Sequence, residues 1–304
     1  MSIMTSMPGI LAAGTGNYLK WTERTSSFST TNIYNSYYDG TGLWIAVGDS
    51  GKIASSSDAI TWTQRTSTFS TTLVSDVAHD GTTWCIVGNS GKMATSTNGT
   101  SWTSRTSSFG SSRIYSIDND GSIWACCGVS SKLATASDPT STWTQRTTSF
   151  GTTILGIAHG STESLWVITG GAGALRTAPD PTSTWTARTS NVADTFRGTA
   201  YRNSTWVGTA NGGLANSSGD GITWTARTLN LSTNDVWGVD GNGSSVWLCG
   251  GDNGQASVSL DDGATWTAEV STGAGSNTIN GIAWGDGMFV AVTDGGQIFT
   301  AELP

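Results

Sequence analysis

The strongest constraint on the fold is a short segment that recurs seven times along the chain. Its most constant part is a Trp-Thr pair, and successive pairs lie 39 to 42 residues apart. The pairs begin at Trp21, Trp62, Trp102, Trp143, Trp185, Trp224 and Trp266. A repeat of this length holds one small structural unit, and stacked units bury a shared core. Seven copies therefore predict either a linear solenoid or a closed propeller.

A single repeat, residues 73–105, shows what each unit builds. It contains four short apolar-rich runs: LVSDVAH, TWCIVG, GKMATS and SWTSR. The runs are separated by the turn-forming residues Asp80-Gly81, Asn89-Ser90-Gly91 and Asn98-Gly99. Such turns connect antiparallel strands, and no helical periodicity is present. Each repeat therefore predicts one four-stranded antiparallel sheet.

The two ends of the chain favour a closed ring. Residues 279–304 contain three strand-like runs without a Trp-Thr strand, whereas residues 17–25 contain a Trp-Thr strand alone. Joining them makes a seventh sheet and removes an exposed sheet edge. We therefore predict an all-β, seven-bladed β-propeller with four antiparallel strands per blade, forming a single domain over residues 1–304. The predicted blades are 32–65, 73–105, 113–146, 154–188, 196–227, 235–268, and 279–304 with 17–25.

Composition argues against several classes of function. The net charge is −8 and only 12% of residues are charged, which argues against nucleic acid as a partner. No segment approaches the roughly 18 apolar residues of a membrane span, and we expect no membrane insertion. The first residues, MSIMTSMPGILAAGTG, lack the basic and long apolar regions of a signal peptide.

The four cysteines predict neither a disulfide framework nor a metal site. Cys85, Cys126 and Cys249 follow a strand tryptophan in different repeats, where small buried side chains are expected. A disulfide between the adjacent Cys126 and Cys127 stays open as an alternative. No CxxC spacing is present, so we expect no zinc and no other cofactor.

The turn before the last Trp-Thr strand carries a further motif. Residues 259–266 read S-x-D-x-G-x-T-W, and this pattern resembles the Asp-box (BNR) hairpin of sialidases, sortilin-type receptors and photosystem II assembly factors. The other repeats depart from it. The resemblance implies a propeller fold and a structural role, at the outer rim, for Ser259, Asp261, Gly263 and Trp266. It indicates fold much more specifically than activity.

A sialidase-like activity is the natural enzymatic hypothesis, but its parts are missing. That family needs three arginines, a Tyr/Glu pair and an Asp near the axis. Outside the recurrent Trp-Thr-x-Arg pattern, only Arg113 and Arg197 fall near the start of an innermost strand. We therefore predict no catalytic residues and no enzyme. His79 and His159 recur at the end of that strand, which predicts packing against a turn.

The recurrent Trp-Thr-x-Arg pattern leaves two interpretations open. It places arginine at one position of six repeats and Glu269 at that position of the seventh; the arginines are Arg24, Arg65, Arg105, Arg146, Arg188 and Arg227. They could form a cationic ring for an anionic ligand. We favour a structural role, in which each arginine bonds a loop carbonyl or a carboxylate.

One position differs completely between the repeats and is the candidate binding site. It lies one residue into the innermost strand and is occupied by Tyr34, Ser75, Tyr115, Leu155, Arg197, Trp237 and Asn280. The innermost strands surround the channel of a propeller, so these side chains are expected at a channel mouth. Their aromatic and cationic members suit sugars or peptides. Alternatively, they vary only to fill a tapering channel.

Three functional hypotheses follow. The main one is a non-enzymatic structural protein of a phage virion, similar to repeat-rich phage propellers, with a host-surface glycan, a host protein or another virion protein as its partner. Near-identical repeats, a Ser/Thr/Gly-rich surface and the expected lack of an export signal motivate this location. The alternative is a peptide- or protein-binding propeller resembling the photosystem assembly factors. The expected location is the virion, assembled in the host cytoplasm, and the alternative location is the cytoplasm, as a soluble protein. The third is a sialidase-like glycosidase.

Overall fold

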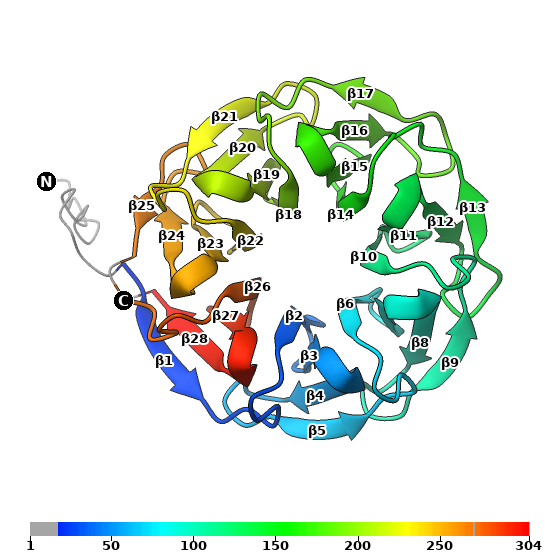
Figure 1. Cartoon of the computed structure of the whole chain (residues 1–304), viewed down its shortest axis with the longest axis horizontal. Helices are drawn as coiled ribbons and strands as arrows, with labels where there is room; N and C mark the ends of the chain where they lie inside the picture. Colours follow the sequence, from blue (N-terminus) through cyan, green and yellow to red (C-terminus); the bar gives the residue numbers. More distant parts are fainter. Residues whose placement is uncertain (1–17, 270, 304) are drawn as a thin grey trace, which may run out of the picture.

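The computed structural model describes residues 18–269 and 271–303, which form seven four-stranded antiparallel sheets arranged as a ring (Figure 1). This confirms the seven-bladed β-propeller predicted from the repeats. Residues 17 and 304, at the ends of the ranges predicted for the last blade, lie outside the described residues. The first 16 residues, on which the export argument depends, lie outside them too.

Every blade has an inner strand at the axis and a second strand paired with it. The inner strands are β2 (Ile33–Tyr38), β6 (Val74–His79), β10 (Ile114–Asn119), β14 (Ile154–Gly160), β18 (Phe196–Arg202), β22 (Val236–Gly241) and β26 (Ile279–Gly285). The second strands are β3 (Trp44–Gly48), β7 (Trp84–Gly88), β11 (Trp124–Gly128), β15 (Leu165–Gly170), β19 (Thr205–Ala210), β23 (Trp247–Gly251) and β27 (Met288–Thr293). We number the blades 1 to 7 in this order.

A third strand and an outer strand complete each blade. The third strands are β4 (Lys52–Ser56), β8 (Lys92–Ser96), β12 (Leu133–Ala136), β16 (Leu175–Ala178), β20 (Leu214–Ser218), β24 (Ala256–Ser259) and β28 (Ile298–Glu302). The outer strands are β5 (Thr63–Thr66), β9 (Thr103–Thr106), β13 (Thr144–Arg146), β17 (Thr186–Arg188), β21 (Thr225–Thr228), β25 (Thr267–Ala268) and, for blade 7, β1 (Lys20–Arg24).

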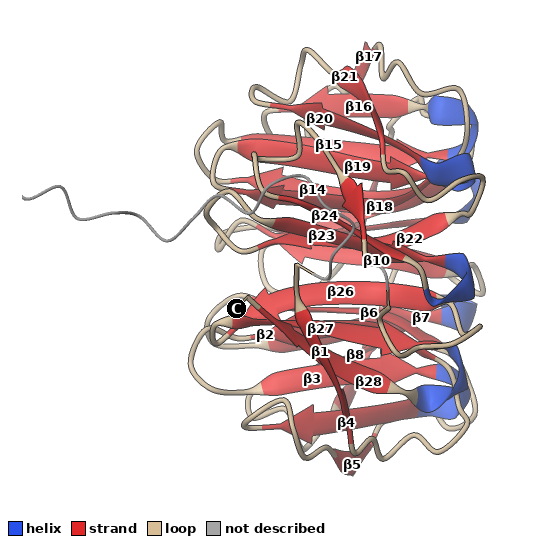
Figure 2. Ribbon diagram, turned by 90° about the vertical axis from the view of Figure 1, so that its left-hand side faces the viewer, coloured by secondary structure: helices blue, strands red, loops and turns tan. Residues whose placement is uncertain are grey.

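A 3-10 helix of three residues links the second and third strands of each blade. These helices are η1 (Asp49–Gly51), η2 (Asn89–Gly91), η3 (Val129–Ser131), η4 (Gly171–Gly173), η5 (Asn211–Gly213), η6 (Asp252–Gly254) and η7 (Asp294–Gly296). Figure 2 shows them along one side of the ring, which we call the 3-10 face. The opposite side carries the turns between inner and second strands, and we call it the hairpin face.

The hydrophobic core lies between neighbouring blades. At the joint between blades 1 and 2, Ile45 and Val47 of β3 pack with Val77 and Trp84 of the next blade. Phe69, from the connection between these blades, is fully buried in the same cluster. The described residues contain one such cluster at each of the seven joints. Each joint buries aromatic side chains of about 150–250 Å² each, so the ring is held by side-chain packing between sheets.

The recurrent arginines are structural, but their hydrogen-bond acceptor differs from the expected one. In blade 1, the Arg65 Nε donates to the Ser55 hydroxyl at 2.7 Å, from the outer strand to the third strand of the same blade. The other five arginines donate in the same way to a Ser or Thr hydroxyl. A buried hydroxyl beside the outer strand offers an acceptor within the sheet, and among the described residues only Arg24 of the six also pairs with a carboxylate, that of Glu302 at 3.6 Å.

Blade 7 is built from both ends of the described chain. β1 pairs with β28 from Lys20↔Glu302 to Arg24↔Ile298, and the two strands lie side by side at the outer edge of the ring (Figure 1). The N-terminal strand β1 is also held by Glu269, which replaces the recurrent arginine in blade 6. Its two carboxylate oxygens accept the Tyr18 N–H at 3.0 Å and the Trp21 indole N–H at 3.4 Å.

Glu269 is explained by a second replacement in the same blade. In the other blades a Ser or Thr of the third strand offers its hydroxyl to the arginine. In blade 6 this position is occupied by Val258, which is identified by its pairing with Leu248 and Thr267. An arginine there would have lost its acceptor. The carboxylate instead reaches the neighbouring blade and connects blade 6 to the N-terminal strand.

We predict that Glu269→Ala selectively loosens β1. The change leaves the Tyr18 N–H and the Trp21 indole N–H without their acceptor, which costs about 1–3 kcal/mol of unfolding free energy. Hydrogen exchange should accelerate in Lys20–Arg24 more than elsewhere. The matched control is Arg105→Ala, which removes the equivalent side chain from blade 2. Equal acceleration of β1 exchange in both variants would contradict the assignment.

Candidate functional site

The seven variable residues share a backbone feature that explains their variation. In blade 1, Ile33 pairs with Gly48 and Asn35 pairs with Val47, so Tyr34 has no residue opposite it. The same β-bulge recurs at every variable position of the other six blades. A bulged residue leaves the ladder and its side chain is re-aimed, a feature common near binding sites. The position is therefore free of the pairing rule that keeps the rest of the repeat constant.

All seven bulged residues line one cavity of about 160 Å³, which we call the narrow cavity. It lies toward the 3-10 face, because each bulge directly precedes or faces the strand end that leads into a 3-10 helix. The structure thus brings together Tyr34, Ser75, Tyr115, Leu155, Arg197, Trp237 and Asn280, as their position in the repeat predicts. Ligand binding by this ring stays a prediction.

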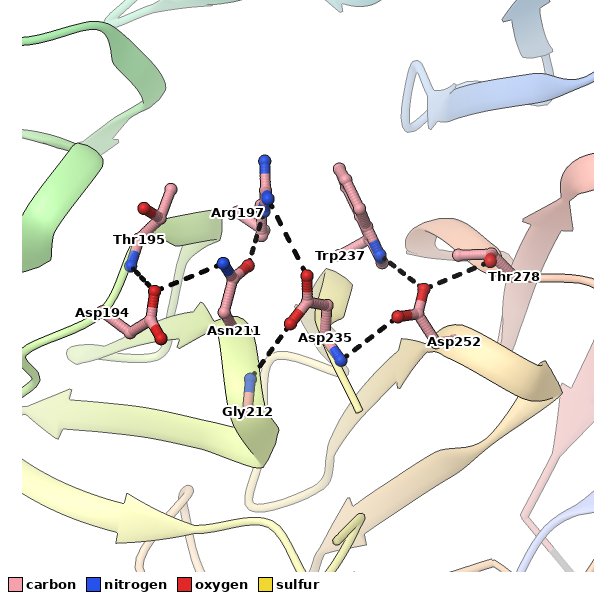
Figure 3. Close-up of polar contacts among 9 residues, drawn as sticks. All are labelled: Asp194, Thr195, Arg197, Asn211, Gly212, Asp235, Trp237, Asp252 and Thr278. Atoms are coloured by element: carbon pink, nitrogen blue, oxygen red, sulfur yellow. Dashed lines mark hydrogen bonds and ion pairs between the residues drawn. The ribbon is translucent and has the colours of Figure 1, made fainter. Parts of the chain in front are cut away.

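Four of the bulged side chains are fixed to the 3-10 helix of their own blade. The Tyr34 hydroxyl donates to Asp49 at 2.9 Å and the Asn280 amide donates to Asp294 at 2.8 Å. The Trp237 indole N–H donates to Asp252 at 2.9 Å and the Arg197 Nε to Asn211 at 2.7 Å (Figure 3). The acceptor is in each case the first residue of the helix. These contacts hold the side chains at the rim of the narrow cavity.

Two arginine–aromatic pairs stand at this mouth. The Arg197 guanidinium carbon lies 4.3 Å from the Trp237 ring centroid. A terminal nitrogen of the same guanidinium lies 3.8 Å from the Asp235 carboxylate (Figure 3). Arg113 stacks on Tyr115, also at 4.3 Å, and its buried Nε has no hydrogen-bond partner among the described residues. Cation–π contact keeps both guanidinium groups oriented.

Burial and the Asp49 carboxylate raise the pKa of Tyr34 to about 12. Its hydroxyl therefore stays protonated and keeps donating to Asp49 at neutral pH. Ser75 has a different role, since its hydroxyl bonds the Ile114 carbonyl of the next blade at 2.5 Å. Asn280 combines both roles, since its amide also donates to the Ile33 carbonyl of the next blade at 2.9 Å.

A larger cavity, which the repeat pattern does not predict, lies toward the hairpin face. This wide cavity has a volume of about 520 Å³ and meets the narrow one at six shared lining residues: Asn35, Asp76, Ser116, Thr199, Val239 and Ile282. Five of the inner strands contribute an aromatic or imidazole ring near its rim: Tyr38, His79, His159, Tyr201 and Trp284. Each ring contacts the first large aromatic residue of the second strand, with centroids 4.5–5.0 Å apart. The two histidines thus pack on a tryptophan of the second strand, and His79 also contacts the turn, where its Nδ1 accepts the Gly81 N–H at 3.2 Å.

Three inner-strand carboxylates connect neighbouring blades within this cavity. Asp76 accepts the Ile117 N–H at 2.9 Å, Asp118 accepts the His159 N–H at 2.8 Å, and Asp240 accepts the Trp284 N–H at 2.8 Å. Each bond runs from one blade to the backbone of the next. An Asp between apolar residues of an inner strand was the available sequence signal, because an unpaired buried carboxylate is costly there.

The electrostatics of the wide cavity differ between these carboxylates. Burial raises the pKa of Asp118 to about 7, aided by the nearby Asp76 carboxylate and opposed by two backbone N–H donors. Burial also raises the pKa of Asp76. Asp240 has a cationic partner, since an Arg202 terminal nitrogen lies 2.9 Å from its Oδ2. Burial lowers the pKa of His79 and of His159, which favours neutral rings at pH 7.

We predict that Asp118→Asn changes the pH dependence of stability. A carboxyl whose pKa is raised in the folded state stabilises below its unfolded pKa and loses that contribution as pH rises toward about 7. The wild type should therefore lose stability relative to Asp118→Asn between about pH 4 and pH 7, by up to about 1.4 kcal/mol per unit. Denaturant titrations of both proteins at several pH values measure the difference. A difference that does not change with pH would contradict the environment assigned to Asp118.

The Asp-box residues lie in the outer turn between β24 and β25. The Ser259 hydroxyl accepts the Gly263 N–H at 2.9 Å, and Asp261 accepts the Thr265 N–H at 2.8 Å. The Trp266 indole N–H donates to the Gly263 carbonyl at 3.1 Å. These bonds fold the turn and anchor the tryptophan in the joint between blades 5 and 6. The motif lies away from both cavities.

The cysteines are reduced, and the described residues offer no metal-binding group and no membrane-spanning helix. Cys85, Cys126, Cys127 and Cys249 are free and buried, so the structure contains no bond between Cys126 and Cys127. Residues 18–269 and 271–303 include no group of three or more His, Cys, Asp or Glu that could hold a metal ion. No helix in these same ranges is long and apolar enough to cross a bilayer.

Comparison with known proteins identifies architecture alone. No protein-family model matches the sequence, so membership of the Asp-box family is not shown. No curated protein sequence matches it either.

Solved structures match it over nearly the whole chain. YCF48 bound to a D1 peptide has a TM-score of 0.76 at 14% identity, covering 95% of this chain and 96% of that one. The WD40 propeller of Doa1 has a TM-score of 0.74 at 10% identity and 96% and 98% coverage. Virginiamycin B lyase from Staphylococcus aureus has 0.81 at 12%, with 94% and 100%. At such identities the likeness shows the propeller fold.

Proposed function

We propose that this chain is a non-enzymatic, peptide- or protein-binding propeller that takes its partner at the 3-10 face. The observation that carries the proposal is the ring of seven bulged, non-repeated side chains around the narrow cavity. The rest of the repeat is constant because it builds the joints. Residues that are excluded from the ladder yet gathered at one mouth are available for recognition.

The size and chemistry of the mouth favour part of a polypeptide over a whole small molecule. About 160 Å³ is less than the usual 300–1,000 Å³ of a small-molecule pocket, but it admits a side chain or a chain end. Arg197, Trp237 and the Arg113–Tyr115 pair are the residue types enriched at the centres of protein interfaces. Their fixed orientation lowers the entropy lost on binding.

The architecture offers a precedent. YCF48, a propeller of the same overall shape, was solved with a bound D1 peptide. The alternative hypothesis from the sequence, a peptide-binding propeller, is therefore favoured over a phage virion subunit or a glycan-binding protein, since none of the three structures named above is a virion protein. The proposal assigns no catalytic role to Arg113 or Arg197.

Selection from random peptide libraries tests this proposal. Peptides selected on the wild type, displayed with either a free N-terminus or a free C-terminus, are compared on Arg197→Ala and Trp237→Ala. We expect each variant to weaken binding about tenfold or more, because a central interface residue typically contributes more than 1 kcal/mol.

The matched control is Arg188→Ala, which removes an outer-strand arginine at the rim of the ring. Its peptide affinity should equal that of the wild type. Failure to select any peptide, or equal binding by all three variants, would overturn the proposal.

A further inference from the structure

The repeats offer an internal comparison at the wide cavity. Asp118 and Asp240 occupy the same position of their inner strands: each stands one residue before the pair formed with the first tryptophan of the second strand. In the blade that precedes each of them, one residue follows the pair formed with the equivalent tryptophan. Before Asp240, in blade 5, that residue is Arg202. Before Asp118, in blade 2, it is Asp80. The two carboxylates therefore occupy equivalent positions but have different neighbours in the preceding blade.

The difference gives Asp240 an ion pair and leaves Asp118 without one, although the more distant Arg202 charge still opposes the rise in the pKa of Asp118. Asp240 accepts an N–H from Arg202 at 2.9 Å. Asp118 has no cationic side chain within ion-pair distance in the described part of the chain, and the donors to its carboxylate among these residues are two backbone N–H groups, those of Asn119 and His159. Asp80 is occupied by its own turn, where its Oδ1 accepts the Thr82 and Thr83 N–H groups at 2.8 and 2.7 Å.

We propose that the wide cavity binds an organic cation, an ammonium or guanidinium group, with Asp118 as its counter-charge. The ligand would occupy at Asp118 the place that the Arg202 guanidinium occupies at Asp240. The cavity, about 520 Å³, lies within the usual range for a ligand of the size of arginine. The Asp118 carboxylate and the aromatic rings of the cavity suit such a cation, whereas a metal ion takes several oxygen ligands, and no group of three or more His, Cys, Asp or Glu in the described residues could hold one.

The groups around Asp118 favour positive charge. The titratable side chains that line the wide cavity with Asp118 are Tyr37 and Tyr38 of β2, Asp76 and His79 of β6 with Asp80, Asp120 after β10, His159 of β14, Tyr201 and Arg202 of β18, and Asp240 of β22. Burial lowers the pKa of both imidazoles and so favours their neutral forms. Carboxylates therefore outnumber the single guanidinium.

Tyr37 offers a second contact for the ligand. Its ring packs edge-on against Trp84, with centroids 6.0 Å apart, and its hydroxyl has no hydrogen-bond partner among residues 18–269 and 271–303. The charge of Asp118 acts on this hydroxyl more strongly than any other charge does. The hydroxyl oxygen can therefore accept a hydrogen bond from a cation held at Asp118.

Titration calorimetry at pH 8 tests the site with two sources of the cation. Agmatine and spermidine supply free amines, and an end-capped pentapeptide with one central arginine or lysine supplies a side chain. We expect at least one source to bind the wild type, with affinity reduced tenfold or more by Asp118→Asn. The matched control, Asp138→Asn, removes the same charge from an outer turn of the same blade and should bind like the wild type.

The pH dependence separates this site from general attraction to an acidic protein. Below about pH 7, affinity should fall by up to tenfold per unit in the wild type and stay level in Asp118→Asn. Tyr37→Phe, which keeps the packing and removes only the hydroxyl, should weaken binding several-fold and decides the question if Asp118→Asn does not fold.

Two results would overturn the proposal: no binding by either source, or binding that neither substitution changes. Binding by only one source identifies the ligand class. Arg197→Ala, at the other mouth, should leave this binding intact, so the present inference and the proposed peptide site fail or succeed separately.

Discussion

Packing between neighbouring sheets is the interaction on which the whole molecule depends. Each blade has two apolar faces, and each face is covered by one of the two neighbouring blades. The angles of the seven joints must together complete the ring, so the volume of side chains at each joint is constrained. Close-packed interiors tolerate little change in volume. This constraint explains why the tryptophans recur and why the connecting residue stays apolar: it is phenylalanine at four joints, and Val192, Leu231 or Ala274 at the other three.

The same constraint determines where the chain is free to vary. A residue in the ladder is fixed by its partners on both sides, whereas a bulged residue is not. The seven bulges therefore collect the differences between repeats at the 3-10 face. At the hairpin face the differences are of another kind: carboxylates and aromatic rings line a wider space and connect blades through backbone N–H groups. The channel thus has two chemically distinct ends.

The repeat pattern predicts the fold and the ring of Tyr34 and its counterparts, because both depend on local strand and turn signals. It does not predict the wide cavity, since Asp118 and Asp240 meet their partners across residues about 40 positions apart. It also misassigns the acceptors of the recurrent arginines, because the hydroxyl at Ser55 looks like any other strand residue. Glu269 is visible as an exception in the sequence, but its partner Tyr18 lies 251 residues away. The repeat pattern predicts the features that all blades share. Contacts between two particular blades can be identified only from the structure.

The joining of β1 to β28 also has a consequence for how the protein is made. The hydrogen bond between Arg24 and Thr300 spans 276 residues, whereas strands within the other blades are neighbours in sequence. During synthesis the first six blades have all their strands before the seventh can form, and blade 1 keeps an uncovered face until then. Contacts of such long separation form slowly, and uncovered apolar sheets aggregate. Until β28 has been made, β1 has no partner strand, so the ring stays open through nearly all of synthesis.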